Sequence, residues 1–168
     1  MSIRPFAPSD ASALTTMLHR AYAELGAAGL NFTAVDQDVQ TTLRRALGGQ
    51  TWVYETDATL CAALAISWPA EASLRSISRE ANVPKRAWLN QLAVDPEHRR
   101  KGLARELRDI GFAWCREQGA TSLGLDTALP ATHLIELYSG WGFETIERVQ
   151  WPGKTYESVV MTRSLAKR

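Results

Sequence analysis

The chain has 168 residues, 45% of them apolar and 22% charged, a composition typical of a globular protein rather than a disordered or collagen-like one. This length fits one domain with a substantial core, so we expect residues 1–168 to form a single domain. The formal net charge of +1 gives no electrostatic case for nucleic acid or a membrane surface as a partner.

The cysteine pattern and the N-terminus bear on the compartment and on metal binding. Cys61 and Cys115 are the two cysteines, and neither belongs to a CxxC motif or to a metal-ligand spacing. A disulfide scaffold and a zinc site are therefore both disfavoured. The sequence shows no N-terminal signal pattern and no apolar run near 18 residues. We therefore expect a cytoplasmic protein without a bound metal.

The first 50 residues predict a short strand followed by two helices. The strand covers residues 3–6, and Ser9 or Asp10 can cap the helix that comes next. This first helix carries one apolar stripe, made of Leu14, Met17, Leu18, Ala21, Tyr22 and Leu25. A second helix begins near Asp36 and ends at Gly48-Gly49. Its predicted apolar face consists of Val39, Leu43, Ala46 and Leu47.

The loop between these helices, residues 27–33, contains two large apolar residues, Leu30 and Phe32. These side chains either cover a substrate pocket or close the core beneath the loop. The sequence leaves both interpretations open.

A hairpin and a variable segment follow. Residues 51–55 and 60–68 read as two strands joined by a turn at residues 56–59. Residues 71–85 have a weak apolar pattern, which predicts a loop or a short helix that covers part of the fold.

Residues 88–119 predict a buried strand, a basic turn and a long amphipathic helix. The strand covers residues 88–94 and stops at Asp95-Pro96, because proline cannot donate to a sheet ladder. The helix begins near Gly102 and ends at Gly119, a residue that readily takes a left-handed C-cap conformation. Its periodic apolar residues are Leu103, Leu107, Ile110 and Trp114.

The rest of the chain predicts a strand, a helix and two more strands. The strand at residues 122–126 precedes a helix that starts after Pro130. One face of this helix carries Leu134, Leu137 and Tyr138. Strands at 143–149 and 156–162 end the pattern. The order β-α-α-β-β-β-α-β-α-β-β predicts a three-layer α/β arrangement with a mixed sheet.

The start of the long helix is a candidate anion site. The first N–H groups of a helix have no intrahelical partner, and the helix dipole adds partial positive charge there. Gly102 allows close approach of a ligand to the backbone, small Ala104 leaves the first turn uncrowded, and Arg99, Arg100 and Lys101 add charge. A diphosphate fits such a site. The alternative is a basic helix terminus on a solvated surface.

The spacing Arg99-x-x-Gly102-x-Ala104 resembles the pyrophosphate loop of the GNAT acetyltransferase superfamily, in the strand–turn–helix setting which that family requires. Residues 92–97 are similar to the preceding strand and turn, and residues 137–143 resemble the family's Leu-Tyr-x-x-x-Gly-Phe signature. The element order is also similar to the GNAT fold, a mixed sheet of about seven strands flanked by about four helices. The resemblance covers nearly the whole chain and is weakest at residues 71–85.

The resemblance implies an N-acetyltransferase that transfers acetyl directly from acetyl-CoA to an amine. It implies that backbone groups on either side of Ala93 hold the pantetheine arm and the thioester oxygen, and that N–H groups of residues 100–105 hold the pyrophosphate. The implied cofactor-binding residues are Leu92, Ala93, Val94, Arg99, Arg100, Lys101, Gly102, Leu103, Ala104 and Arg105.

Tyr138 is the catalytic residue that the resemblance implies, as proton donor to the departing thiolate. A phenol with a pKa near ~10 stays neutral at pH 7 and can still donate a proton. The alternative is a core tyrosine on an amphipathic helix.

Two positions depart from the family pattern. Ala131 stands where many members have asparagine, and Asn90 stands where many have glutamate. Asparagine cannot accept the amine proton, so the sequence assigns no general base. Asp126, His133 or an ordered water could replace it, although Asp126 also fits a turn at a strand end and His133 an exposed first helical turn.

The acceptor is left open as an amine of a small molecule or a protein, and a homodimer is possible because dimers are common in the family. Two alternatives to acetyl transfer remain: an enzyme for a longer acyl-CoA, and a non-catalytic CoA-binding or regulatory domain. Cys115 lies beside Trp114 with no histidine or aspartate nearby in sequence, which favours a packed thiol over a nucleophile.

Overall fold

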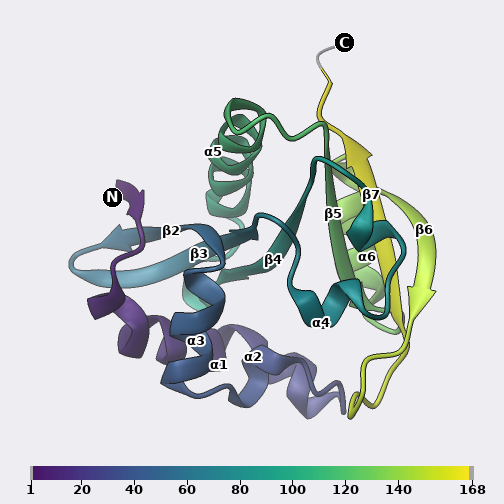
Figure 1. Ribbon diagram of the computed structural model, residues 1–168. Helices are drawn as coiled ribbons and strands as arrows, with labels where there is room; N and C mark the ends of the chain where they lie inside the picture. The colour runs from purple at the N-terminus through teal and green to yellow at the C-terminus, as the bar shows by residue number, and fades with distance from the viewer. Residues whose placement is uncertain (1, 167–168) are drawn as a thin grey trace.

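The computed structural model describes residues 2–166, in which a seven-stranded mixed sheet has helices on both faces (Figure 1). The strands are β1 (Ser2–Pro5), β2 (Gly49–Thr56), β3 (Thr59–Ser67), β4 (Arg86–Val94), β5 (Ser122–Ala128), β6 (Glu144–Val149) and β7 (Ser158–Ser164). The α-helices are α1 (Ala11–Ala27), α2 (Thr33–Asp36), α3 (Val39–Ala46), α4 (Ala72–Arg75), α5 (Leu103–Glu117) and α6 (Thr132–Gly140). Single 3₁₀ turns are η1 (Pro8–Asp10), η2 (Glu80–Asn82) and η3 (Pro96–His98).

The predicted three-layer α/β fold is confirmed, including the mixed sheet and the order of its strands along the chain. The four helices expected from periodicity are α1, α3, α5 and α6. Of the other two, α2 is a single turn between the predicted loop and the second helix, and α4 is a single turn inside the variable cover. No helix among residues 2–166 is long and apolar enough to cross a membrane.

The strand order is β1-β2-β3-β4-β5-β7-β6, and in the described chain β4 and β5 are the one parallel pair. They pair over just three positions, from Arg86 opposite Ser122 to Trp88 opposite Gly124. Gly124 is required here, because a Cβ on it would lie 2.3 Å from the Trp88 ring. Beyond this point β4 and β5 separate, and the sheet opens between them.

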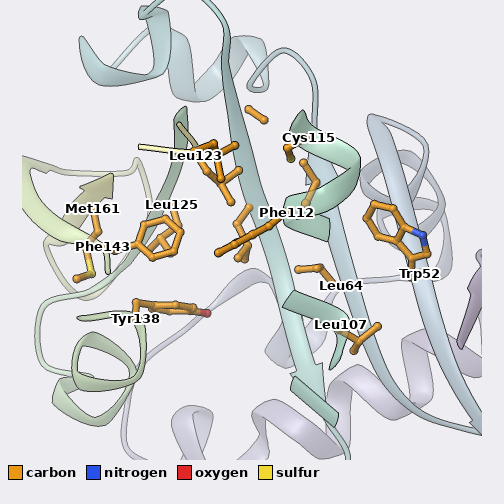
Figure 2. Close-up of a cluster of buried hydrophobic side chains, with 14 of the residues drawn as sticks. Trp52, Leu64, Leu107, Phe112, Cys115, Leu123, Leu125, Tyr138, Phe143 and Met161 are labelled. Carbon is orange, nitrogen blue, oxygen red and sulfur yellow. The ribbon is translucent and has the colours of Figure 1, made fainter. Parts of the chain in front are cut away.

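Helices α1 and α3 pack on one face of the sheet and α5 on the other (Figure 1). The α1 stripe predicted from the sequence is buried at Leu14, Met17, Leu18 and Ala21. On the other face, α5 lies close to β3 because Gly111 presents no side chain, and a Cβ there would be 2.7 Å from Leu64. Figure 2 shows this larger core between the sheet, α5 and α6.

The predicted apolar face of α3 is wrong at two positions. Val39 is 39% exposed and Leu47 is 58% exposed, whereas Thr42 and Ala46 are buried. The helix turns Thr42 inward because its hydroxyl lies 2.7 Å from the Thr15 hydroxyl of α1 and accepts from the Gln37 amide at 2.7 Å. The buried face of α3 thus contains a hydrogen-bonded threonine, where apolar periodicity predicts aliphatic side chains.

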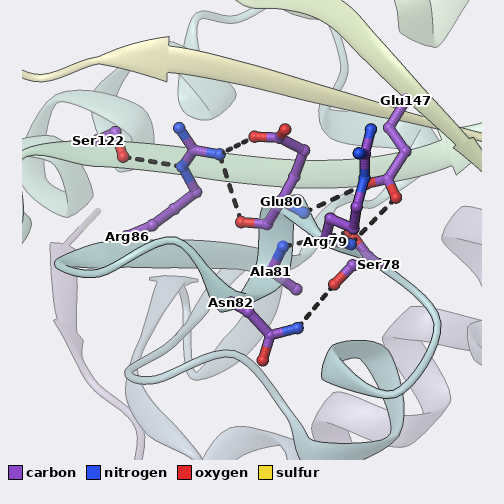
Figure 3. A network of polar contacts seen from close by, with 8 residues as sticks. All are labelled: Ser78, Arg79, Glu80, Ala81, Asn82, Arg86, Ser122 and Glu147. Carbon is purple, nitrogen blue, oxygen red and sulfur yellow. Dashed lines mark hydrogen bonds and ion pairs between the residues drawn. The ribbon is translucent and has the colours of Figure 1, made fainter.

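The segment 71–85 is a loop with two short helical turns, as predicted, and polar contacts bind it to the sheet (Figure 3). Glu147 on β6 accepts from the Ser78 hydroxyl at 2.7 Å and the Arg79 N–H at 3.0 Å. The Arg86 guanidinium pairs with Glu80 and donates to the Ser122 hydroxyl at 2.8 Å. The cover is therefore attached to β4, β5 and β6 at once.

Candidate active site

Two cavities meet where β4 and β5 separate. One, of about 670 Å³, is bounded by residues 98–105 at the start of α5, and we call it the loop cavity. The other, of about 240 Å³, contains Trp88 and Trp151, and we call it the tryptophan cavity. Both are lined by Tyr22, Leu92, Leu134 and Tyr138, so the two spaces adjoin across the opening in the sheet.

The loop cavity collects the residues that the sequence predicted for cofactor binding, apart from Lys101. Its lining includes Leu92, Ala93, Val94, Arg99, Arg100, Gly102, Leu103, Ala104 and Arg105. Lys101 is exposed and lies outside the lining. The binding role itself stays a prediction, but the positions converge on one space.

Arg99 is held against α1, so its charge is fixed in place. Its guanidinium donates to the Ala21 carbonyl at 2.9 Å and pairs with Glu24 at 3.2 Å. Arg99 therefore fixes the loop beside α1 and leaves Arg100 and Arg105 as the exposed cations on this lining.

The start of α5 has the backbone geometry of an anion site. Arg100 and Gly102 take positive φ angles of 62° and 84°, and no side chain caps the helix. The Glu106 N–H donates to the Gly102 carbonyl at 3.1 Å, so the N–H groups of residues 103–105 precede the intrahelical ladder. These groups and the helix dipole favour a negatively charged ligand.

Asp95 anchors the turn that leads into this helix. Its buried carboxylate accepts from the Arg20 guanidinium at 2.8 Å and from the Glu97 N–H at 3.1 Å. Burial pushes the pKa of Asp95 upward, but these hydrogen bonds and the Arg20 charge outweigh it, and the pKa lies below its ordinary value. The turn thus rests on a charged carboxylate.

The exposed edge of β4 offers backbone donors to the opening. The Tyr22 hydroxyl donates to the Leu92 carbonyl at 2.8 Å, so this carbonyl points away from β3. Because the N–H and C=O of a strand residue point to the same side, the N–H groups of Leu92 and Val94 also face the opening. The Leu92 carbonyl is already bonded, which leaves the Leu92 N–H and both backbone groups of Val94 as the available contacts.

Tyr138 lies at the junction of the two cavities. The residue is 7% exposed, and its ring packs edge-on against Trp141 and Phe143, with centroid distances of 5.7 Å and 6.1 Å. Figure 2 shows Tyr138 beside Phe143 in the core. Among residues 2–166 its hydroxyl has no hydrogen-bond partner. Burial raises its pKa, and the nearby Tyr22 and Asp126 add to the effect, so the phenol stays protonated at neutral pH. Tyr138 is thus both packed against the core and open to the cavities.

Asp126 is an enclosed carboxylate in the tryptophan cavity, and the interpretation of it as a strand-end turn residue is wrong. Strand β5 continues to Ala128, and the Asp126 side chain accepts from the indole N–H groups of Trp88 at 2.9 Å and Trp151 at 2.8 Å. Burial raises the pKa of Asp126, although the two indoles work against this. His133 lines the loop cavity instead, so the two candidate bases lie on different sides of Tyr138.

Asn90 lies at a β-bulge in β4, between a carboxylate and a guanidinium. Register with β3 passes from Gln91 to Leu89, which leaves Asn90 unpaired. Its amide donates to Glu71 at 3.2 Å, and its carbonyl accepts from Arg45 at 3.2 Å. Sequence reasoning missed Glu71, because no spacing relates a residue of the weakly patterned cover to a strand that follows it.

Leu30 and Phe32 take on both roles that the sequence left open. Phe32 lines the tryptophan cavity and Leu30 the loop cavity, and both pack against a small cluster that includes Tyr156. The loop is fixed from the other side by the β6–β7 connection, where Thr155 N–H donates to the Asn31 side chain at 2.9 Å. These two loops lie together at the lower right of Figure 1.

The remaining polar candidates have structural surroundings. Cys115 is buried in the larger core, and burial raises the pKa of its thiol to about 12. No group of three or more His, Cys, Asp or Glu side chains in the described part of the chain is placed to hold a metal ion. The chemistry available is therefore a candidate anion site, a protonated tyrosine and a half-buried carboxylate, in that order across the opening.

Comparisons with known proteins place the chain in a family. Residues 15–143 match the family described as "Acetyltransferase (GNAT) family". N-acetyltransferase 8 of Homo sapiens is 28% identical over 118 residues, which cover 58% of this chain and 52% of that protein. The chain thus spans about half of the length of this curated relative.

Solved structures share the fold. The ribosomal-protein-S18-alanine N-acetyltransferase of Escherichia coli has a TM-score of 0.74 at 17% identity, over 99% of this chain and 95% of that chain. The yncA protein of Salmonella typhimurium, solved with its cofactor acetyl-CoA, has a TM-score of 0.71 at 18% identity, over 100% and 95% of the two chains.

Proposed function

The chain belongs to the acetyltransferase (GNAT) family, and we propose that it transfers the acetyl group of acetyl-CoA to an amine of a small molecule or a protein. The observation that carries this proposal is the place of Tyr138, which lies where the loop cavity meets a second cavity that contains a carboxylate. A transferase needs such a junction, because donor and acceptor must approach the same atoms from two sides.

The loop cavity is the proposed site of acetyl-CoA. The N–H groups of residues 103–105 and the side chains of Arg100 and Arg105 bind the diphosphate, and Arg99 holds the loop in place. The pantetheine arm then runs along the free edge of β4 towards Tyr138. Ala131, where many family members have asparagine, is buried in this lining and offers no side-chain hydrogen bond.

The tryptophan cavity is the proposed site of the amine. Asp126 accepts a proton from the amine as its nitrogen forms a bond to the thioester carbon. The N–H groups of Leu92 and Val94 stabilise the negative charge that develops on the thioester oxygen. Tyr138 gives its proton to the sulfur as the carbon–sulfur bond breaks, so the products are an amide and a free thiol.

The test is a direct measurement of transfer. The purified chain is incubated with acetyl-CoA and a panel of primary amines, and free thiol and acetylated product are both quantified. We expect product and thiol in equal amounts with at least one amine. Binding of acetyl-CoA without product across a broad panel of amines would favour a non-catalytic CoA-binding domain. Faster transfer from a longer acyl-CoA than from acetyl-CoA would favour an enzyme for that longer acyl group.

A further inference from the structure

Three cationic side chains line the tryptophan cavity without a carboxylate partner. They are Arg44 and Arg45 of α3 and Lys154 of the β6–β7 connection. Within residues 2–166, none of the three takes part in an ion pair. The lining carries two carboxylates, Glu71 and Asp126, against these three cations, so positive charge is left over.

Neutral oxygens hold two of these cations in place. Arg45 donates to the Gln37 side-chain oxygen at 3.1 Å and to the Asn90 carbonyl at 3.2 Å. Lys154 donates to the Asn31 carbonyl at 2.6 Å and to the Thr33 hydroxyl at 3.2 Å. These contacts fix the side chains without neutralising them, and both groups keep unused N–H donors.

The two positive charges also act on each other. Burial lowers the pKa of Lys154, and the charge of Arg45 lowers it further, while Asp36 and Asp126 oppose this more weakly. Partly buried charges in proteins are normally paired, so two cations that repel each other across a cavity favour an anionic ligand between them. An arginine is especially suited to a carboxylate, which it can bind with two parallel hydrogen bonds.

The rest of the lining is aromatic. Phe32 lies 5.7 Å from the Tyr22 ring and 5.2 Å from the Tyr156 ring, measured between centroids. Trp88 and Trp151 also line the cavity, and their indole N–H groups donate to Asp126. A ligand for this cavity therefore combines an apolar or aromatic body with polar groups at its ends.

We propose that the acceptor is a small amine that also carries a carboxylate or comparable anionic group, and that Arg45 and Lys154 bind this group. The inference rests on the proposed function, because it takes the tryptophan cavity as the acceptor site. The amine then lies towards Asp126 and Tyr138, and the anion of the same molecule satisfies the unpaired cations. The N-terminal residue of a protein carries a neutral amide in place of this anion. Such an acceptor would leave Arg45 and Lys154 without an anionic partner.

The experiment compares matched acceptors that differ in one group. Phenylalanine is compared with phenylalanine amide, and para-aminomethylbenzoate with its amide, with kcat/KM calculated for the unprotonated amine. We expect the acid to be preferred by about tenfold or more in at least one pair, the usual value of a charge-assisted hydrogen bond. Amides that react as well as the acids in both pairs would overturn the anion site and favour a protein amino terminus.

Variants test which residues cause the preference. Arg45→Gln and Lys154→Met should each reduce the acid-to-amide ratio towards one, whereas Arg148→Gln, which removes an exposed arginine outside the cavity, should keep it. Arg45→Lys keeps a positive charge at this position and should therefore keep part of the acid-to-amide preference. An unchanged ratio in Lys154→Met and Arg45→Gln would overturn the assignment. Transfer to no amine at all would instead overturn the proposed function.

Discussion

Tyr138 combines a ring packed in the core with a hydroxyl at the junction of the two cavities. Its ring packs against Trp141 and Phe143 in the larger core, while its hydroxyl has no protein partner in residues 2–166. A purely structural tyrosine at this depth would be expected to use its hydroxyl in a hydrogen bond. The free hydroxyl favours the role of proton donor over that of a core residue.

Replacement of Tyr138 by phenylalanine should remove the reaction but not the fold. The ring and its packing remain, so the melting temperature and the affinity for acetyl-CoA should change little. The single-turnover rate should fall by about 10²–10⁴-fold, the usual contribution of a positioned general acid. Tyr54→Phe, at a buried tyrosine outside both cavities, is the matched control. A wild-type rate in Tyr138→Phe would make Tyr138 a core residue only.

Asp126 should determine how the rate depends on pH. A carboxylate base works when deprotonated, so the rate at saturating acetyl-CoA should rise with pH through the pKa of Asp126 and then level off. Burial raises this pKa above its ordinary value of about 3.9, which moves the rise towards neutral pH. In Asp126→Asn the plateau should disappear, and the rate should keep rising towards the pKa of the amine.

Glu71 is the second carboxylate on the same cavity and provides the comparison for Asp126. Glu71→Gln should keep the plateau. The Glu71 carboxylate accepts from the Asn90 amide, whereas the indole N–H groups of the tryptophan cavity bond Asp126. Loss of the plateau in Glu71→Gln with its retention in Asp126→Asn would transfer the role of base to Glu71.

At the scale of elements, the start of α5 is the part most directly matched to a diphosphate. Gly102→Val is a poor test of this site, since the positive φ of 84° strains any larger residue there. Ala104 is better placed: it lies in the first turn, on the loop cavity, and has ordinary helical geometry.

Ala104→Glu should weaken acetyl-CoA binding strongly and leave the fold intact. The new side chain adds bulk and negative charge where the diphosphate is expected, while glutamate is tolerated well in a first helical turn. Ala113→Glu makes the same change on the exposed face of α5 and should bind acetyl-CoA like the wild type. Calorimetric titration of both variants decides the matter, and equal affinity would place the diphosphate elsewhere.

The short parallel pairing of β4 and β5 divides the sheet into two groups of strands. Strands β1 to β4 and strands β5 to β7 form two groups that meet at three residue pairs, and the opening beyond Trp88 and Gly124 creates the two cavities. The cover at residues 71–85 joins both groups through Glu147 and Arg86, as Figure 3 shows. We propose on this basis that residues 1–168 unfold as one domain.

Thermal unfolding tests the single domain and the ligand together. Tryptophan fluorescence and far-ultraviolet circular dichroism should report one coincident transition. Acetyl-CoA at about 100 times its Kd should add about 2.7 kcal/mol to the free energy of unfolding and raise Tm by about 5–10 °C. Two separate transitions would contradict the single domain, and a shift that Ala104→Glu leaves unchanged would contradict the assigned site.

The sequence by itself determined the order of the elements and the position of the candidate anion site. Apolar periodicity at helical spacing identifies α1 and α5, and two apolar runs on either side of a short polar turn identify the β2–β3 hairpin, where Asp57 and Ala58 both take positive φ angles. The pattern from Arg99 to Ala104 is local, because a loop and a helix start are adjacent in the chain. Local patterns of this kind are readable before the fold is known.

Only the tertiary structure decided what faces the opening between β4 and β5. Asp126, Glu71, Arg45 and Lys154 come from four separate segments, and no spacing in the sequence brings them together. The sequence left Asp126 open as a base or a turn residue and gave no reason to consider Glu71, because the environment of a carboxylate depends on side chains from other segments. The enclosure by Trp88 and Trp151 exists because the sheet splits at Gly124, and a split in a sheet is a property of the packed molecule.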